Sequence, residues 1–140
     1  MANKFGQLLV PYDGSTNSKR ALNKAISLAS LSHATITLVH VISYHGAMAK
    51  IAQPYKGKVI SHVKEFMKDA KKLALRDNVL LEQKILYGSP AEEVLKLMKK
   101  KKFDLVIMGK RGTTRVTGPT LGSVSNALVQ SSKVPIMIVV

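Results

Sequence analysis

An apolar run leads through a glycine-rich basic loop to the start of a helix in the sequence Leu105-Val-Ile-Met-Gly109-Lys-Arg-Gly112-Thr-Thr-Arg-Val-Thr-Gly-Pro-Thr-Leu-Gly122-Ser123-Val-Ser125. The apolar run at 105–108 is typical of a buried strand, and the residues after Gly122 are typical of first helical turns. Glycines let a backbone approach an anion closely, and the N–H groups and dipole of a helix N-terminus favour negative charge. This strand–loop–helix unit therefore predicts a phosphate site within an α/β fold.

The glycines of this loop have the spacing G-x2-G-x9-G-S, with Gly109, Gly112, Gly122 and Ser123 at the fixed positions. The spacing differs from that of the P-loop, which ends in Gly-Lys-Ser/Thr, and from the GxGxxG turn of dinucleotide folds. Ser123 and Ser125 add hydroxyl donors at the helix start. The alternative interpretation is a surface loop whose glycines serve only turns.

Apolar segments alternate with helical patterns along the whole chain. Parallel strands need helical crossovers, and wholly apolar runs are typical of strands buried on both faces. The alternation predicts an α/β fold of one domain, in which five parallel strands form an open sheet with helices on both faces. Strands are expected at 5–10, 34–42, 79–87, 105–108 and 135–140. Four helices are expected between them: the first begins near residue 15, the second follows a loop at 43–58, and the third and fourth begin at 90 and 122.

One helix carries clear signals at both of its ends. Ser89-Pro-Ala-Glu92 has the pattern of a capping box with proline at the first helical position. Lysines at 99–102 end the helix, where cations stabilise the negative end of the dipole. Its buried side is expected to consist of Ala91, Val94, Leu95 and Met98.

Two chain segments are expected to meet at one end of the sheet. Ligands of open α/β sheets bind beyond the carboxyl ends of the strands, where the strand order reverses. Asp13 and Gly109 both stand at the ends of predicted strands, so we expect them to converge.

The sheet edges have their own signals. Glu82-Gln-Lys84 is polar and suits an edge strand, whereas Pro135–Val140 is wholly apolar and uncharged. Such a strand is an aggregation hazard if it is left unpaired, so we expect a second copy of the chain to pair with it in a homodimer. The alternative is a central place for this strand in the sheet.

Composition limits the classes of protein. The chain of 140 residues has no cysteine and a formal net charge of +14, concentrated on two predicted helices between residues 50 and 102. A solvated helix face is favoured there over a nucleic-acid patch, because no aromatic residues interleave with the lysines. No apolar run reaches the roughly 18 residues of a membrane helix, and no secretory signal precedes the first strand, so a cytoplasmic protein without membrane contact is expected. No histidine spacing such as HExxH indicates a metal site.

The whole chain resembles the universal stress protein family, specifically its ATP-binding branch. Besides the glycine signature, Leu9-Val-Pro-Tyr-Asp13-Gly-Ser15 is similar to that family's first strand and turn, and Leu38-Val-His-Val41 to its second strand. Gly88–Leu95 and Val134–Val140 are similar to its third helix and its dimerising last strand. The resemblance implies one universal stress protein domain over 1–140, with a Rossmann-like fold like that of adenine nucleotide alpha hydrolases.

The resemblance also implies the binding residues. It places the ribose hydroxyls on Asp13 and the adenine against Pro11 and Val41, with Tyr12 beside them. Met108, Gly109 and Gly112 would line the ribose and phosphate path, and a divalent cation, Mg²⁺, would bridge the phosphates. The phosphates themselves would be held by Gly122, Ser123, Val124 and Ser125.

Three functions remain open from the sequence. The first is a dimeric stress-response or signalling module that binds ATP, with ADP and AMP as alternative ligands, and has no dedicated catalytic turnover. The second is a slow ATPase or self-phosphorylating protein that uses the same pocket. The third is a basic interaction protein with a vestigial pocket. The complete G-x2-G-x9-G-S signature and Asp13 favour the first over the third, and the lack of a catalytic constellation favours it over the second.

Overall fold

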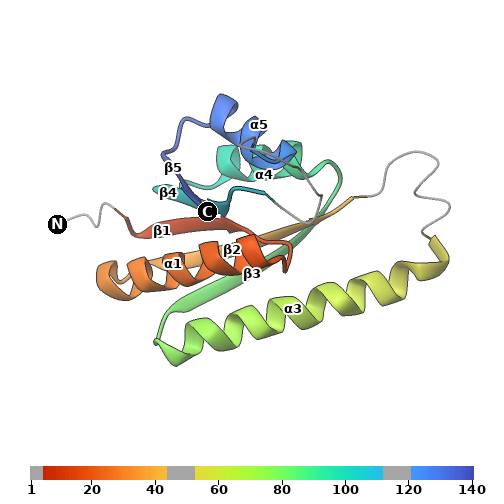
Figure 1. Ribbon diagram of the computed structural model, residues 1–140, viewed down its shortest axis with the longest axis horizontal. Helices are drawn as coiled ribbons and strands as arrows, with labels where there is room; N and C mark the ends of the chain where they lie inside the picture. Colours follow the sequence, from red (N-terminus) through yellow and green to blue (C-terminus); the bar gives the residue numbers. More distant parts are fainter. Residues whose placement is uncertain (1–4, 44–52, 112–120) are drawn as a thin grey trace.

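The computed structural model describes residues 5–43, 53–111 and 121–140. They form one sheet of five parallel strands in the order β3-β2-β1-β4-β5, with helices on both faces (Figure 1). The predicted α/β fold is confirmed. The elements are β1 (Gln7–Pro11), α1 (Thr16–Ser32), β2 (Thr35–Ile42), the 3-10 turn η1 (Gln53–Tyr55), α3 (Lys56–Arg76), β3 (Leu80–Tyr87), α4 (Pro90–Lys100), β4 (Leu105–Gly109), α5 (Ser123–Ser131) and β5 (Ile136–Val139).

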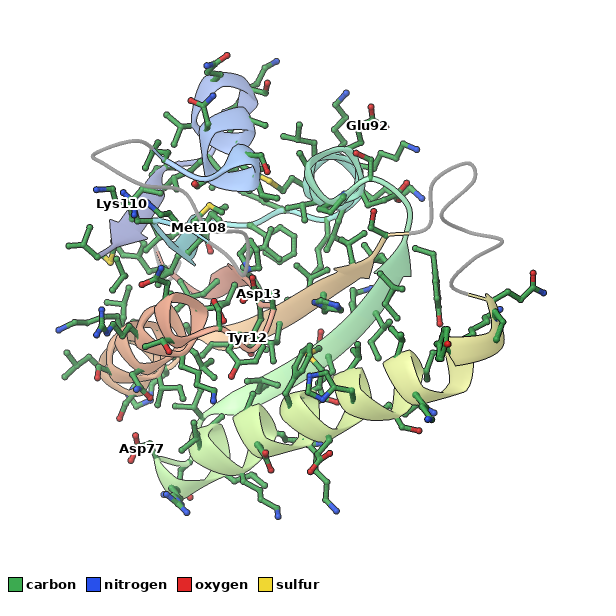
Figure 2. All side chains as sticks on the ribbon, turned by 45° about the vertical axis from the view of Figure 1, so that its right-hand side comes forward. Tyr12, Asp13, Asp77, Glu92, Met108 and Lys110 are labelled. Carbon is green, nitrogen blue, oxygen red and sulfur yellow. The ribbon has the colours of Figure 1, made fainter. Side chains whose placement is uncertain are left out.

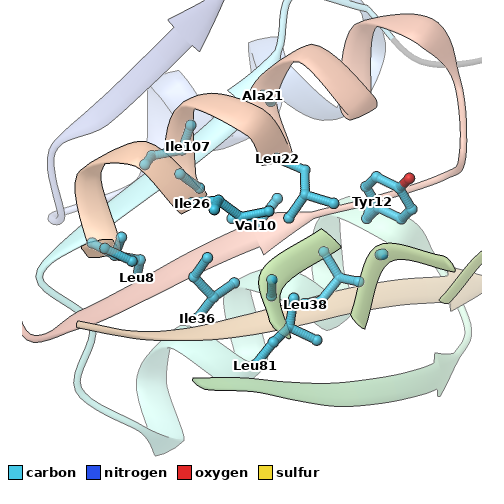
Figure 3. Packing of buried hydrophobic residues seen from close by; sticks show 14 of the residues in the cluster. Leu8, Val10, Tyr12, Ala21, Leu22, Ile26, Ile36, Leu38, Leu81 and Ile107 are labelled. Carbon is cyan, nitrogen blue, oxygen red and sulfur yellow. The ribbon is translucent and has the colours of Figure 1, made fainter. Parts of the chain in front are cut away.

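The core has two layers, one on each face of the sheet. Helices α1 and α3 cover one face, and α4 and α5 cover the other (Figure 1). Strand β1 lies in the centre of the sheet, and its residues Leu8, Leu9 and Val10 have no exposed surface. Leu8 and Val10 pack toward α1 and α3, as Figure 3 shows, whereas Leu9 packs toward α4 and α5. Each such buried side chain contributes about 1.5–3 kcal/mol.

Local capping determines where the helices begin. The Ser15 hydroxyl accepts a hydrogen bond of 3.2 Å from the Ser18 N–H and so starts α1. Helix α4 begins at Pro90 as predicted. The predicted capping box is not formed, however, because the Ser89 side chain makes no capping hydrogen bond. Proline at the first turn starts this helix without it, since its fixed φ already suits a helix.

Two other predictions were wrong in detail. Residues 56–58, expected in a loop, belong to α3, because a glycine such as Gly57 is tolerated in an exposed first turn. On α4 the buried residues are Val94 and Leu97, whereas Ala91, Leu95 and Met98 are only partly buried. Leu97 belongs to the same buried cluster as Leu128, because α4 and α5 pack side by side on this face of the sheet.

The sheet order creates a switch point beside β1. Strand β1 pairs with β2 on one side and with β4 on the other. The carboxyl ends of β1 and β4, at Pro11 and Gly109, therefore open at the same edge. Strands β3 and β5 are the edge strands, so the alternative of a central last strand is wrong. Within the parts of the chain that the structure describes, no helix is long and apolar enough to cross a bilayer.

Candidate functional site

A cavity of about 360 Å³ lies at the carboxyl ends of β1, β2 and β4, between helices α4 and α5. Asp13 and Gly109 both line it, so the predicted convergence of the two chain segments is confirmed. Its position is the switch point at which open α/β sheets bind their ligands. The lining residues are Pro11, Tyr12, Asp13, Ser18, Val39, His40, Val41, Ser43, Pro90, Val94, Met108, Gly109, Arg111, Gly122, Ser123, Val124 and Ser125.

Most of the site residues inferred from the sequence lie in this cavity. Ten of the eleven appear among its lining residues, namely Pro11, Tyr12, Asp13, Val41, Met108, Gly109, Gly122, Ser123, Val124 and Ser125. The eleventh, Gly112, lies outside the described residues.

The cavity also includes seven residues beyond the eleven inferred from the sequence, one of which, Arg111, is a cation of the glycine-rich basic loop. They are Ser18, Val39, His40, Ser43, Pro90, Val94 and Arg111. Val39 could have been found, because it stands two residues before Val41 and a strand directs such residues to the same face. Pro90 and Val94 could not, because nothing in the local sequence says where α4 crosses the sheet.

The N-terminus of α5 forms one wall of the cavity. Gly122 is the N-cap residue, and the first backbone bond of the helix runs from the Asn126 N–H to the Gly122 carbonyl. The N–H groups of Ser123, Val124 and Ser125 come before that bond in the chain, so no carbonyl of the helix accepts a hydrogen bond from them. This end of the helix favours an anion through its dipole and its unused N–H groups.

Ser125 joins the two ends of the glycine loop. Its hydroxyl is buried and lies 2.8 Å from the Lys110 carbonyl and 3.1 Å from the Gly122 carbonyl. The Gly122 N–H donates to the same Lys110 carbonyl at 2.9 Å. Because the hydroxyl hydrogen is used on the backbone, Ser125 offers a ligand its N–H group rather than the hydroxyl donor expected from the sequence.

Asp13 provides a carboxylate at the mouth of the cavity. Its Oδ1 accepts a hydrogen bond of 2.9 Å from the Ser15 N–H, which holds the side chain at the start of α1. Figure 2 shows Asp13 and Tyr12 at the end of β1. Gly14 follows with φ of +78°, and a Cβ there would meet the Phe66 ring at 3.1 Å. The turn that presents Asp13 therefore packs closely against α3 and needs a glycine.

The backbone of β1 is fixed beside the cavity by Tyr12 and His40. The Tyr12 N–H donates to the Val39 carbonyl at 2.8 Å, and His40 Nδ1–H donates to the Tyr12 carbonyl at 2.8 Å. Both rings pack edge-on against Phe66. Burial lowers the pKa of His40. This effect is larger than those of the hydrogen bond to Tyr12 and the nearby charge of Asp13, which both raise the pKa. Burial, with the charges of Asp13 and Asp69, raises the pKa of Tyr12, so both side chains are neutral at pH 7.

Apolar side chains line the part of the cavity between β2 and α4. Val39 and Val94 are fully buried, and Val41 is partly exposed. Met108 of β4 closes this side and is also buried. Such a surface suits a flat, apolar ring, whereas the helix end and Asp13 suit polar groups. In the described parts of the chain no three His, Cys, Asp or Glu side chains gather as a metal site.

Comparison with known proteins identifies the family. The model of the universal stress protein family matches residues 4–140. The chain belongs to the universal stress protein family. Universal stress protein YxiE of Bacillus subtilis is 30% identical to it, over 96% of this chain and 99% of the relative. Universal stress protein MJ0531 of Methanocaldococcus jannaschii is 29% identical, over 98% of this chain and 83% of the relative.

Solved structures of universal stress proteins share the fold. Protein MJ0577 of Methanocaldococcus jannaschii superposes with a TM-score of 0.86 at 26% identity, covering 97% of this chain and 96% of that one. A universal stress protein in complex with cAMP gives a TM-score of 0.77 at 23% identity, with 98% of each chain covered. The Archaeoglobus fulgidus protein in complex with dAMP gives 0.76 at 17% identity, covering 97% of this chain and 98% of that one.

Proposed function

We propose that this universal stress protein is a dimeric stress-response module that binds an adenine nucleotide, with ATP as the principal ligand and ADP or AMP as alternatives. The observation that carries the proposal is the cavity at the switch point, which combines an apolar wall, one carboxylate and the N-terminus of a helix. These three features correspond to the base, the ribose and the phosphates of a nucleotide.

The apolar wall suits the adenine ring. Val39 and Val41 present one strand face, and Val94 approaches from α4. Packing a flat ring against this wall removes apolar surface of the ring and of the partly exposed Val41 from water, which stabilises the complex by about 25 cal/mol per Å². Backbone groups at Val41 would read the edge of the base.

Asp13 and the start of α5 suit the polar parts of the nucleotide. A carboxylate such as that of Asp13 accepts hydrogen bonds from two neighbouring ribose hydroxyls. The N–H groups of Ser123, Val124 and Ser125 would bind the phosphates, with Met108, Gly109, Gly112 and Gly122 along the path. Mg²⁺ would bind mainly to phosphate oxygens and water, because the described residues that line the cavity include a single carboxylate, that of Asp13.

Relatives of known structure support an adenine nucleotide as the ligand. Two universal stress proteins of this fold have been solved with cAMP and dAMP, which share the adenine base and a phosphate. The choice of ATP over ADP and AMP is a more specific part of the proposal. It rests on the glycine spacing and on Arg111, a cation that lines the cavity at the start of the loop.

No dedicated turnover is proposed for this pocket. Among its described lining residues, the titratable side chains other than Tyr12 are Asp13, His40 and Arg111. His40 uses Nδ1–H on the Tyr12 carbonyl, and Asp13 accepts from the Ser15 N–H. General base catalysis of ATP hydrolysis needs a base aimed at the attacking water, whereas the His40 ring packs edge-on against Phe66 of α3 and the Asp13 carboxylate holds the start of α1.

The homodimer is proposed to form through β5. This edge strand, Ile136–Val139, is uncharged, and Met137 is 41% exposed while Val140 after it is 77% exposed. Val129 on α5 adds a further exposed apolar side chain at 47%. A second copy of the chain, pairing through residues 135–140, would cover the strand edge and these side chains.

Calorimetric titration tests the nucleotide proposal. ATP, ADP, AMP and GTP would be titrated with and without Mg²⁺ into the wild type, Asp13→Asn and Asp104→Asn. Each variant removes one negative charge and keeps a side-chain oxygen that can accept the same backbone hydrogen bond. The donor of that bond is the Ser15 N–H for Asp13 and the Gln7 N–H for Asp104. Only Asp13 lines the cavity.

We expect ATP to bind the wild type and Asp104→Asn equally, and Asp13→Asn at least about tenfold more weakly, which corresponds to the loss of one charged hydrogen bond. Absence of binding by every nucleotide to folded, ligand-free protein would overturn the proposal. Tighter binding of GTP than of ATP would overturn the choice of adenine.

A further inference from the structure

Helix α3 carries a line of cations that the nucleotide pocket does not use. Lys64, Lys68, Lys72 and Arg76 follow one another at intervals of four residues. In an α-helix such residues form a row that advances about 6 Å along the axis and turns about 40° around the helix at each step. We refer to these four residues as the cationic ridge, which extends about 18 Å along the helix.

The cationic ridge faces solvent. The opposite side of α3 packs on the sheet through Val63, Met67, Ala70 and Ala74, which are buried. All four ridge residues are exposed, and α3 lies along the outside of the molecule next to β3 (Figure 1). Glu65 and Asp69 stand three residues before Lys68 and Lys72 on the same helix. The ion pairs within residues 5–43, 53–111 and 121–140 are Lys96–Glu93 and Lys101–Glu82, so no ridge residue forms an ion pair with an acidic side chain among these residues.

Ordinary structural reasons do not explain the cationic ridge. Like charges four residues apart destabilise a helix, and the ridge contains three such successive pairs, of which Glu65 and Asp69, each three residues before a ridge lysine, offset only a part. The helix dipole accounts only for Arg76, which is the basic residue of the last turn. Helix α4 differs in this respect, because its Lys99 and Lys100 both lie in the last turn. A solvated face, which the sequence favoured, does not by itself require this regular spacing.

We propose that the cationic ridge of α3 binds the phosphate backbone of double-stranded DNA without reading its sequence. A continuous row of cations along one helix is complementary to a linear polyanion, and each cation that neutralises a phosphate releases condensed counterions. The net charge of +14 would also steer the protein toward such a partner. A length of about 18 Å corresponds to about five base pairs of duplex.

The surroundings of the ridge favour duplex DNA over other polyanions. Single strands are bound by stacking mainly on large aromatic rings, and the exposed Phe and Tyr rings among the described residues, Phe5, Tyr55 and Tyr87, all lie outside the ridge. A membrane-surface helix buries its apolar face in lipid, whereas the apolar face of α3 is already buried on the sheet. Leu75 is the exposed large apolar residue within the span of the ridge.

The cationic ridge and the nucleotide pocket are separate surfaces. No α3 residue is among the described residues that line the cavity. DNA binding therefore does not depend on the proposed nucleotide ligand, and each proposal can fail without the other.

Fluorescence anisotropy with a labelled mixed-sequence DNA duplex tests the ridge. In one variant Lys64, Lys68, Lys72 and Arg76 are all replaced by glutamine. The matched control replaces Lys96, Lys99, Lys100 and Lys102 by glutamine, which removes the same charge from exposed positions on and just after α4. The binding constant of each protein would be measured between about 50 and 200 mM salt.

We expect the ridge variant to reduce the magnitude of the slope of log K against log salt by about 3.6, because each of the four lost phosphate contacts contributes about 0.9. The control should change this slope little. Lys68→Gln alone should reduce the slope by about 0.9 and covers the case in which the fourfold variant folds poorly. Absence of wild-type binding at the lowest salt, or equal losses in the ridge variant and the control, would overturn the proposal. A ridge variant that keeps DNA binding but loses binding to phosphatidylserine vesicles would also overturn it, in favour of a membrane surface.

Discussion

The Ser125 hydroxyl donates a hydrogen bond of 2.8 Å to the carbonyl of Lys110, across the base of the glycine loop. The Gly122 N–H donates to the same carbonyl. One peptide group at the end of β4 thus holds the N-terminus of α5 in place, on the wall of the cavity where phosphates are proposed to bind. The geometry of this end of the site depends on a side chain that is itself buried.

Ser125→Ala should therefore weaken both the fold and the ligand site. Loss of this buried hydrogen bond is expected to lower the free energy of unfolding by about 0.5–1.5 kcal/mol, as measured by urea denaturation. Ser123→Ala is the control, because the exposed Ser123 hydroxyl makes no hydrogen bond to the described residues. Equal stability of the two variants would contradict the structural role of Ser125.

Gly109→Ala should destabilise the protein through a backbone clash. A Cβ at Gly109 would lie 2.9 Å from the backbone carbon and oxygen of Asn17, at the start of α1. Neither backbone can yield easily, so we expect a loss of about 1–3 kcal/mol in thermal or chemical unfolding.

Gly57→Ala is the matched control for that substitution. A Cβ at Gly57, in the first turn of α3, would meet nothing within 4 Å. Because alanine restricts the unfolded chain more than glycine does, this change should stabilise the protein by about 0.4–1 kcal/mol. A Gly109→Ala variant as stable as Gly57→Ala would show that β4 and α1 do not approach so closely.

Stability should depend on pH through His40. Burial lowers the pKa of His40 in the folded protein below its ordinary value of 6.5, so between the two values the unfolded chain binds more protons. The free energy of unfolding should therefore fall as pH drops below about 6.5 and level off below the folded pKa. Above that window His40 is neutral in both states and adds no pH dependence.

Urea denaturation at a series of pH values measures this effect. His40→Asn removes the titrating group and retains a side-chain donor for the Tyr12 carbonyl, so part of the pH dependence should disappear. His33→Asn, at an exposed position after α1, is the control substitution. An unchanged profile in His40→Asn would refute the assignment.

Met137→Lys should separate the proposed dimer. The substitution places a charge on the uncharged edge strand β5, where a partner strand would have to bury it. Light scattering should give twice the chain mass of 15.3 kDa for the wild type and a single chain mass for the variant. Leu80→Lys is the control, since Leu80 is also exposed but lies on β3, at the opposite edge. A monomeric wild type would rule out the dimer.

Sequence patterns predicted much of the architecture because strands and helices leave local periodic signals. Apolar runs such as 105–108 marked buried strands, and the polar Glu82-Gln-Lys84 marked β3 as an edge. Helix boundaries were less certain where the signals conflicted. Gly57 suggested a loop, yet it lies inside α3, since an exposed first turn tolerates glycine.

The class of fold, the parallel sheet and the glycine spacing could be predicted from residues that are close together in the chain. The folded chain shows in addition that Val94 of α4 lines the same cavity as Val39 and Val41, and that the Ser125 hydroxyl is used on the Lys110 carbonyl. It also shows that Gly109 is needed for contact with Asn17. These relationships depend on the order of strands and on where each helix crosses the sheet, and the local sequence does not encode either.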